Sequence, residues 1–351
     1  MHRISVINKA IIEKNLDMKV AVEAVKKAYI LNAHKEVELF NTVFHDFKET
    51  TADLDIKSGN ISKEGIFGFK MMTWFQDNAQ KNIPTLNGMI MLFDNHTGVP
   101  IALLDAEYIT GMRTGAAAGI GTKYLAREAS ENMLMIGCGN QAPFQIAATL
   151  LLMDNVKKVF LYDPISYENA VKFSKEIKRI LLNDFLSKFD EDKDLYECYR
   201  TKIDIHFDAI EDIEEATKNA DIITTATPSR KPLIKKEWVK EGTHITCMGA
   251  DMEGKQEIDE NLFSVAKVFV DDIEKTSKVG EMESAIKKGI FLKEDIVCEI
   301  GEVIKGQKRG RSTDKEITIF DASGLATQDL MTANFLFKLA NKKELGIEIE
   351  L

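Results

Sequence analysis

The stretch from Met133 to Ala142 combines residue types that suit it to holding phosphate groups. Four apolar residues, typical of a buried strand, precede Gly137, Gly139 and Ala142 in the spacing G-x-G-x-x-A. In a strand–turn–helix unit, the first glycine allows a sharp turn, the second leaves room for a pyrophosphate, and the small third residue lets helix and strand pack closely. The N–H groups at the start of the helix then face the phosphates. The pattern predicts a dinucleotide-binding turn made of Gly137, Gly139, Asn140, Gln141 and Ala142.

An acidic residue, Asp163, ends the next predicted strand, Val156–Asp163. Its separation from the glycine turn is close to the roughly 20 residues at which a carboxylate meets the ribose hydroxyls of NAD. No arginine follows within three residues to receive the 2′-phosphate of NADP, so NAD is the favoured cofactor. The alternative is that the glycines make a tight turn only and Asp163 caps the next helix.

The composition bounds the class of protein. A chain of 351 residues, 44% hydrophobic and 29% charged, is long enough for two globular domains. Its net charge of −10 argues against nucleic acid as a partner, because phosphates would be repelled.

Cysteine and histidine usage points to a reduced, metal-free protein. The four cysteines form no C-x-x-C pattern and the six histidines show no metal-ligand spacing. No signal peptide and no apolar run long enough for a membrane span is visible. We therefore expect a soluble cytoplasmic protein without a metal.

The elements that carry these residues follow from the hydrophobic pattern. The first part of the chain predicts one helix from Ile11 to about His34, an extended stretch, a hairpin of Gly88–Asp94 and Val99–Asp105, and a small-residue helix from Ala106 to Ala126. Lys70 interrupts an apolar run, where a lysine either snorkels out at a sheet edge or points into a polar site.

From Asn132 the pattern alternates between strand and helix, which predicts a parallel sheet. The charged segment from Asp184 to Lys202 is interpreted as a solvated surface extension. A strand at 317–324 and an apolar helix at 326–342 close the chain. The predicted fold class is α/β, with a Rossmann domain inserted in an α+β domain.

Several motifs occur together in one order: Gly68-Phe-Lys70, Leu92 to Asp105, Arg113-Thr-Gly-Ala-Ala, Gly137 to Ala142, Thr225-Ala-Thr-Pro-Ser229, Gly249 to Glu257, Glu299-Ile-Gly-Glu302 and Phe320 to Ala326. In this order the chain resembles the ornithine cyclodeaminase/mu-crystallin family, which includes alanine dehydrogenase and ketimine reductase branches. The resemblance implies a homodimer, with a dimerisation and substrate domain at 1–129 plus 321–351 and an NAD-binding Rossmann domain at 130–320. It also implies an active site in the cleft between the domains.

The resemblance assigns roles to three charged residues. Lys70 and Arg113 match the pair that holds the substrate carboxylate, with Lys70 also counted as catalytic, and Asp251 matches the catalytic acid/base beside the substrate nitrogen. The chemistry supports these roles, because hydride removal from Cα needs a deprotonated amine and a negative charge near the developing iminium. The plainer alternatives are that Arg113 pairs at the surface, Lys70 snorkels and Asp251 caps a helix.

Further positions match the family's cofactor contacts. Besides the glycine turn and Asp163, they are Thr85, Arg113, Thr114, Thr225, Thr227, Met248, Gly249 and Ser323.

One position departs from the family pattern. Many members carry an arginine in the first extended stretch as a third contact to the substrate carboxylate, whereas Asn41 stands there in this chain. No arginine lies between Arg3 and Arg113. Either Asn41 supplies a neutral hydrogen bond or the substrate end differs.

Conversion of L-ornithine to L-proline and ammonia is the leading functional expectation. Alanine dehydrogenase and ketimine reductase activities are the alternatives, and Gly249 to Gln256 resembles the alanine dehydrogenase branch somewhat more than the cyclodeaminases. A protein of another class, which binds NAD(H) and a small ligand without turnover as mu-crystallin does, is disfavoured by Lys70, Arg113 and Asp251 together.

Overall fold

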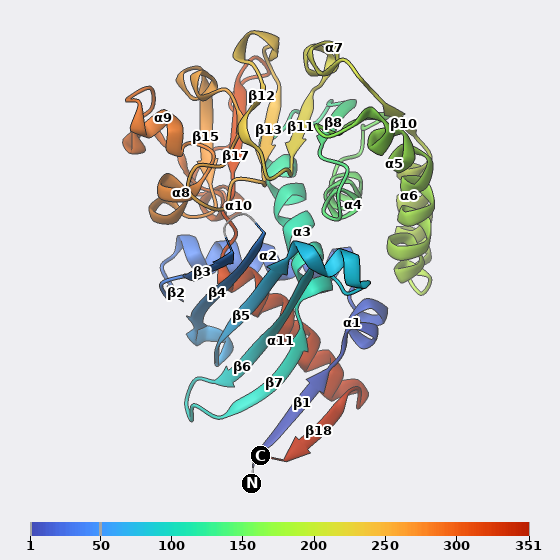
Figure 1. Cartoon of the computed structure of the whole chain (residues 1–351), viewed down its shortest axis with the longest axis vertical. Coiled ribbons are helices and arrows are strands. Elements are labelled where there is room, and N and C mark those ends of the chain that lie inside the picture. The colour runs from blue at the N-terminus through green and yellow to red at the C-terminus, as the bar shows by residue number, and fades with distance from the viewer. Residues whose placement is uncertain (1, 49–50, 351) are drawn as a thin grey trace. The chain divides into compact units, whose positions relative to one another are not determined.

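The computed structural model describes residues 2–48 and 51–350, and the chain folds into two compact units (Figure 1). Unit 1 comprises Met1–Leu16, Glu23–Arg113 and Leu325–Leu351, and unit 2 comprises Asp17–Val22 and Thr114–Gly324. These boundaries differ from the expected ones at 129/130 and 320/321. Positions 1 and 351 of the expected first domain lie outside the described residues.

Unit 1 is built on one mixed sheet of eight strands. Its strand order is β18-β1-β7-β6-β5-β4-β2, with β3 paired to β4. Neighbouring strands are antiparallel except for β1 and β7, which are parallel. The strands are β1 (Arg3–Ile7), β2 (Glu38–Leu39), β3 (Val43–Lys48), β4 (Ala52–Ile61), β5 (Ile66–Phe75), β6 (Leu86–Asp94), β7 (Pro100–Asp105) and β18 (Ile347–Glu350).

Helix α11 (Ala326–Lys343) packs against the middle of this sheet, on β4, β5 and β6 (Figure 1). The buried positions of β5 alternate with less buried ones, so that Gly68 and Lys70 share a face. A Cβ on Gly68 would lie 2.2 Å from the carbonyl oxygen of Met91 and 3.1 Å from the side chain of Leu330. Glycine at 68 therefore lets β5 approach both β6 and α11 closely.

The hairpin is confirmed as β6 and β7, but the single helix expected from Ile11 to His34 is wrong. Two helices form instead, α1 (Lys9–Asn15) and α2 (Met18–Ala33). Asp17 interrupts the run because its carboxylate accepts a hydrogen bond from the N–H of Val20 at 2.8 Å, which caps the start of α2.

Unit 2 is built on a parallel sheet with the order β10-β9-β8-β11-β13-β17-β15-β16. Its first five strands follow the 3-2-1-4-5 order of a Rossmann fold, as the sequence predicts. The strands are β8 (Asn132–Ile136), β9 (Lys158–Tyr162), β10 (His206–Ala209), β11 (Ile222–Thr225), β13 (His244–Cys247), β15 (Ala266–Val270), β16 (Cys298–Glu299) and β17 (Ile317–Asp321), beside a separate pair, β12 (Arg230–Ile234) and β14 (Gln256–Ile258).

The helices of unit 2 connect these strands. They are α4 (Ala142–Leu152), α5 (Tyr167–Ile180), α6 (Lys193–Ile203), α7 (Ile213–Asn219), α8 (Ile273–Val279), α9 (Glu283–Lys287) and α10 (Ile300–Ile304). The small-residue helix is α3 (Glu107–Leu125), whose two ends belong to different units. No helix in residues 2–48 and 51–350 has the length and apolar character to cross a membrane.

The small residues of α3 permit a close approach of α4. A Cβ on Gly115 would lie 2.4 Å from the carbonyl oxygen of Phe144, and one on Gly119 would lie 2.8 Å from the Cβ of Ala148. Glycine at these two positions therefore lets the backbones of α3 and α4 lie close together.

The interpretation of 184–202 as a solvated extension is wrong. After α5 the chain continues through a π-helical turn and α6, and Phe185, Leu186, Phe189 and Tyr199 are buried. The hydroxyl of Tyr199, on α6, donates a hydrogen bond of 2.9 Å to the carbonyl of Ala147 on α4. The charged run at 190–194 led to the wrong interpretation, because it covers only the turn before α6 and the first residues of that helix.

Candidate functional site

The glycine turn of unit 2 has the geometry that a dinucleotide needs. Gly137 adopts a φ of 98°, and a Cβ there would lie 2.7 Å from the carbonyl oxygen of Ala226. Around a Cβ built at Gly139, by contrast, no described atom lies within 4 Å. Helix α4 begins at Ala142, so the free N–H groups of its first turn lie beside the glycine turn. Tight packing at the first glycine and open space at the second fit a bound pyrophosphate.

Asp163 lies at the end of β9, next to the glycine turn. One carboxylate oxygen accepts the N–H of Cys138 at 3.1 Å, and the other accepts the N–H groups of Ile165 and Ser166. Although burial opposes ionisation, these bonds and one from the Asn169 side chain hold the pKa of Asp163 below its usual range. Asp163 thus stabilises the turn that follows it and also binds the backbone of the glycine turn at Cys138.

A buried carboxylate that the sequence reasoning missed, Glu257, joins two loops at the ends of β11 and β13. It accepts hydrogen bonds from the hydroxyl of Thr225 at 2.6 Å, from the N–H of Thr227 at 2.6 Å and from the N–H of Gly249 at 3.0 Å. Burial raises the pKa of Glu257, and the pKa of its neighbour Glu281 is raised further by burial and by the charge of Glu257. Glu257 therefore positions three of the predicted cofactor contacts together.

Asp251 lies in the loop that follows Gly249. Its side chain is 42% exposed and one carboxylate oxygen lies 2.7 Å from the Nζ of Lys255. The loop continues into β14 rather than into a helix, so the alternative that Asp251 caps a helix is wrong. Half-buried Met248 lies at the start of the same loop, where its N–H donates to the carbonyl of Thr225.

Ser323 follows β17 at the same carboxyl edge of the sheet. Its hydroxyl lies 3.4 Å from the carboxylate of Asp271, which also accepts the N–H of Gly324 at 2.8 Å. The hydroxyl of Thr276 donates to Asp271 as well, at 2.6 Å. The predicted contacts from Gly137 to Ser323 thus gather where the parallel strands end, which is where open α/β sheets bind ligands.

Unit 1 holds the predicted carboxylate-binding pair. The Nζ of Lys70 and the Nε of Arg113 each lie 3.0 Å from the same oxygen of Asp329, on α11. Lys70 is 2% exposed and Asp329 is fully buried. Burial and then the neighbouring charge of Arg113 lower the pKa of Lys70 to about 8. The alternatives of a snorkelling Lys70 and a surface Arg113 are both wrong.

Asp329 was also missed by the sequence reasoning, since a lone aspartate in an apolar helix gives little signal. Burial opposes its ionisation, but the charges of Arg113 and Lys70 outweigh burial and hold the pKa of Asp329 below its usual range. Its second oxygen has no hydrogen-bond partner within the described residues, and neither does the amide nitrogen of Gln328. Gln328 accepts from Arg113 at 3.2 Å. This buried polar group retains capacity for a further partner.

The remaining predicted residues lie elsewhere. Asn41 is exposed between β2 and β3, Thr85 is half-buried just before β6, and Thr114 is buried on α3. Asn41 is therefore not part of the buried group around Asp329.

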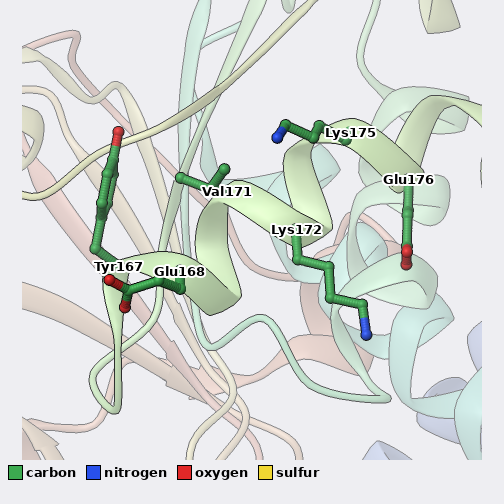
Figure 2. Close-up of a pocket in the computed structure, with 6 residues that line it drawn as sticks. All are labelled: Tyr167, Glu168, Val171, Lys172, Lys175 and Glu176. Carbon is green, nitrogen blue, oxygen red and sulfur yellow. The ribbon is translucent and has the colours of Figure 1, made fainter.

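A shallow hollow on unit 2 contains none of the predicted residues. Figure 2 shows it along one face of α5, lined by Tyr167, Glu168, Val171, Lys172, Lys175 and Glu176. Its lining comes from a single helix.

Comparison with known proteins shows relatives that match this chain along nearly its whole length. An alanine dehydrogenase of Archaeoglobus fulgidus is 37% identical over 339 residues, which cover 97% of this chain and 96% of that protein. The solved structure of an archaeal alanine dehydrogenase dimer with bound NAD matches with a TM-score of 0.85 at 36% identity, over 100% of both chains. The structure of Thermococcus litoralis Δ1-pyrroline-2-carboxylate reductase with NADH and L-proline matches with a TM-score of 0.86 at 28% identity, over 99% of this chain and 100% of that one.

A family model matches residues 4–187 and 190–344. Together with a relative of such identity and coverage, this match turns the resemblance of the motifs into a finding: the chain belongs to the ornithine cyclodeaminase/mu-crystallin family.

Proposed function

We propose that the protein is an NAD-dependent oxidoreductase that exchanges a hydride at the Cα of a small 2-amino or 2-imino acid. The observation that carries this proposal is the 37% identity to an alanine dehydrogenase over 97% of the chain. The Thermococcus litoralis enzyme is named as a reductase of Δ1-pyrroline-2-carboxylate. The C2 atom of that compound bears both a nitrogen and a carboxylate, as the Cα of an amino acid does. The buried pair of Lys70 and Arg113 supports a substrate with a carboxylate.

In this proposal Lys70 and Arg113 bind the substrate carboxylate and thereby fix the orientation of Cα. Two cations that face one carboxylate restrict its rotation, and such positioning contributes much of an enzyme's rate. Asp251 exchanges the proton of the substrate nitrogen, and a negative charge there also stabilises an iminium. The Nζ of Lys255 lies 2.7 Å from a carboxylate oxygen of Asp251.

The dinucleotide is proposed to be NAD, bound at the glycine turn with Asp163 at the ribose. When bound, it supplies the hydride acceptor or donor. The open space at Gly139 and the start of α4 suit the pyrophosphate, and Thr225, Thr227, Met248, Gly249, Ser323, Thr85, Thr114 and Arg113 are its further proposed contacts.

Cyclodeamination of L-ornithine to L-proline is kept as the second candidate. The family name and the acid at Asp251 support it, but the relatives named above are a dehydrogenase and an imine reductase. The first assays should therefore test amino-acid dehydrogenation and imine reduction before cyclodeamination.

We also propose a homodimer formed through unit 1. Strand β3 exposes Val43, Phe44 and Phe47, and the neighbouring Phe40 is exposed too. Such a row of exposed apolar side chains is unusual for a monomer surface. The related alanine dehydrogenase structure is described as a dimer.

The test measures NADH absorbance with the purified protein and one substrate at a time. The substrates are pyruvate with ammonia, Δ1-pyrroline-2-carboxylate, and L-ornithine with NAD, for which ammonia and proline are also measured. Oxidation of NADH with pyruvate and ammonia supports an alanine dehydrogenase, and oxidation with the cyclic imine supports a reductase. Ammonia and proline without net NADH would establish the cyclodeaminase instead. Binding of NADH with no turnover of any substrate would favour a non-catalytic binding protein.

A further inference from the structure

Three buried carboxylates form a cluster next to the loops that carry predicted cofactor contacts. They are Glu257 on β14, Glu281 between α8 and α9, and Asp321 at the end of β17, each 0% exposed. Backbone N–H groups and a threonine hydroxyl donate hydrogen bonds to them, and these donors are neutral. Within the described part of the chain, dipoles rather than a cation therefore stabilise this carboxylate cluster.

The carboxylate cluster cannot hold three charges in neutral solution. Burial penalises every ionised carboxylate, and each ionised neighbour makes the next ionisation harder. Burial and then the charge of Glu257 raise the pKa of Glu281 well above its usual range. Burial raises the pKa of Asp321 to about 8, and the charges of Asp271 and Glu257 add to this rise. On β13, burial and then Glu281 raise the pKa of the Cys247 thiol, so no compensating charge comes from there.

Glu257 is the member whose hydrogen bonds suit an ionised carboxylate. Its Oε1 accepts the N–H of Thr227, and its Oε2 accepts the N–H of Gly249 and the hydroxyl of Thr225. Hydrogen bonds donated to both oxygens favour the charged form of a carboxyl group. The negative charge of the cluster is therefore best placed on Glu257.

Glu281 uses its two oxygens differently. Oε1 accepts the N–H groups of Glu257 and Ile258, each at 2.6 Å, whereas Oε2 is buried without a hydrogen-bond partner among the described residues. A protonated carboxyl has this asymmetry, because its carbonyl oxygen accepts bonds while its other oxygen carries the proton.

The backbone that Glu281 binds is the backbone of Glu257 itself. Glu281 thus fixes the start of β14, and the side chain of Glu257 extends from there to the loops after β11 and β13. A Cβ on Gly249 would lie 2.5 Å from Oε2 of Glu257, which shows how closely the loop and this carboxylate pack. A displaced Glu257 would release Thr227 and Gly249 together.

We propose that Glu281 keeps its proton and is a positioning residue for the dinucleotide site: it fixes Glu257, and Glu257 fixes Thr227 and Gly249. This inference deepens the proposed function and rests on its NAD site. It predicts that two adjacent buried glutamates respond in opposite ways to the same substitution by glutamine.

The experiment uses the full-length protein and two measurements, fluorescence titration with NADH at pH 7 and urea unfolding between pH 5 and 8. The variants are Glu281→Gln, which imitates a protonated carboxyl, Glu281→Met, which removes both oxygens, and Glu257→Gln. Glu294→Gln, an exposed carboxylate of the same unit, is the matched control.

NADH affinity should stay within about twofold of the wild type in Glu281→Gln and in Glu294→Gln, since a neutral amide can replace a protonated carboxyl. It should fall at least about tenfold in Glu257→Gln, because the new NH2 group would face a backbone N–H on either side. Glu281→Met should also fall by about tenfold, because two buried N–H groups lose their acceptor.

Urea unfolding tests the proton of Glu281 directly. The unfolded wild type releases this proton above the usual pKa near 4.5, whereas the folded protein keeps it, so stability is lost as the pH rises. The ratio of the unfolding constants of the wild type and Glu281→Gln should therefore grow by about tenfold per pH unit from pH 5 to 8.

A ratio that does not change with pH, or a loss of NADH affinity in Glu281→Gln as large as in Glu257→Gln, would overturn the inference. A wild type that binds no NADH would refute the proposed NAD site and the positioning role with it. If NADH binding shows the expected difference between the two glutamine variants but no substrate is turned over, only the proposed oxidoreductase activity is refuted.

Discussion

Charged side chains in unit 1 show how far burial changes a residue's behaviour. Lys70 is a cation at neutral pH in water, yet burial and its neighbours bring its pKa to about 8. Asp329 stays ionised because Lys70 and Arg113 compensate for its burial. The group is therefore charged at neutral pH and begins to lose charge in mildly alkaline solution.

Carboxylate binding should accordingly weaken above pH 8. Lys70 is protonated below its pKa and neutral above it, so the affinity for pyrrole-2-carboxylate should fall by up to roughly tenfold per pH unit above pH 8. Calorimetric titration between pH 7 and 9.5 measures this dependence, since the ligand itself stays ionised there. The variant Lys70→Arg, whose guanidinium does not titrate in this range, should show a flat profile. A flat profile for the wild type would exclude Lys70 from the carboxylate site.

Asp251 carries the proposed proton transfer. We expect Asp251→Asn to reduce kcat by at least about 100-fold, because an amide cannot accept the proton, while the affinity for NADH stays within about twofold. Steady-state kinetics and fluorescence titration of NADH measure the two quantities. Asp259→Asn, a carboxylate beyond the end of β14, serves as the control and should leave kcat unchanged. Near-normal turnover in Asp251→Asn would remove Asp251 from the mechanism.

At the scale of elements, the predicted contacts from Gly137 to Ser323 lie where the parallel strands of unit 2 end. Buried carboxylates fasten these ends: Glu257 binds the loops after β11 and β13, and Asp271 binds the turn after β17. The loops after β11, β13 and β17 are thus each held by a side chain from another element. The loop with Asp251 begins at one such fastening, at Gly249.

The two glycines of the dinucleotide turn should respond differently to substitution. Gly137→Ala forces a Cβ to within 2.7 Å of the carbonyl of Ala226 at a φ of 98°, and should lower the free energy of unfolding by about 1–3 kcal/mol. Gly139→Ala meets no described atom, so its stability should be near that of the wild type while its NADH affinity falls. Urea denaturation and NADH titration of both variants test this. Normal NADH affinity in Gly139→Ala would show that the pyrophosphate does not bind at this turn.

At the scale of the whole molecule, assembly should depend on the exposed apolar face of β3. Phe44 and Phe47 are 45% and 56% exposed, and replacing both with aspartate should convert the proposed dimer into a monomer of 39.5 kDa. Light scattering after size-exclusion chromatography measures the mass, and circular dichroism checks that the variant is folded. Ile165→Asp, 84% exposed on unit 2, is the control and should stay dimeric. A folded dimer in the double variant would place the interface elsewhere.

The sequence by itself determined the fold class, the family and the glycine turn. These depend on local signals: an apolar strand, a fixed glycine spacing and the alternation of strand with helix are all contained in short stretches. Such local patterns were enough to predict the hairpin at 86–105 and the parallel strands from 132 onward. The local pattern gave wrong predictions at two places. At Asp17 a single capping aspartate divides a stretch with helical periodicity, and at 184–202 a mostly charged stretch has a buried helix face.

Only the tertiary structure decided which charges meet. Asp329 follows Lys70 by most of the chain length, and it meets Lys70 because α11 packs on β5. Lys57 faces Lys70 because of strand register, and a slip of one residue would turn it to the other side. Glu257 likewise accepts a hydrogen bond from Thr225, a residue 32 positions earlier in the chain. A buried charge is tolerated only with its partners in place, and those partners come from distant parts of the sequence.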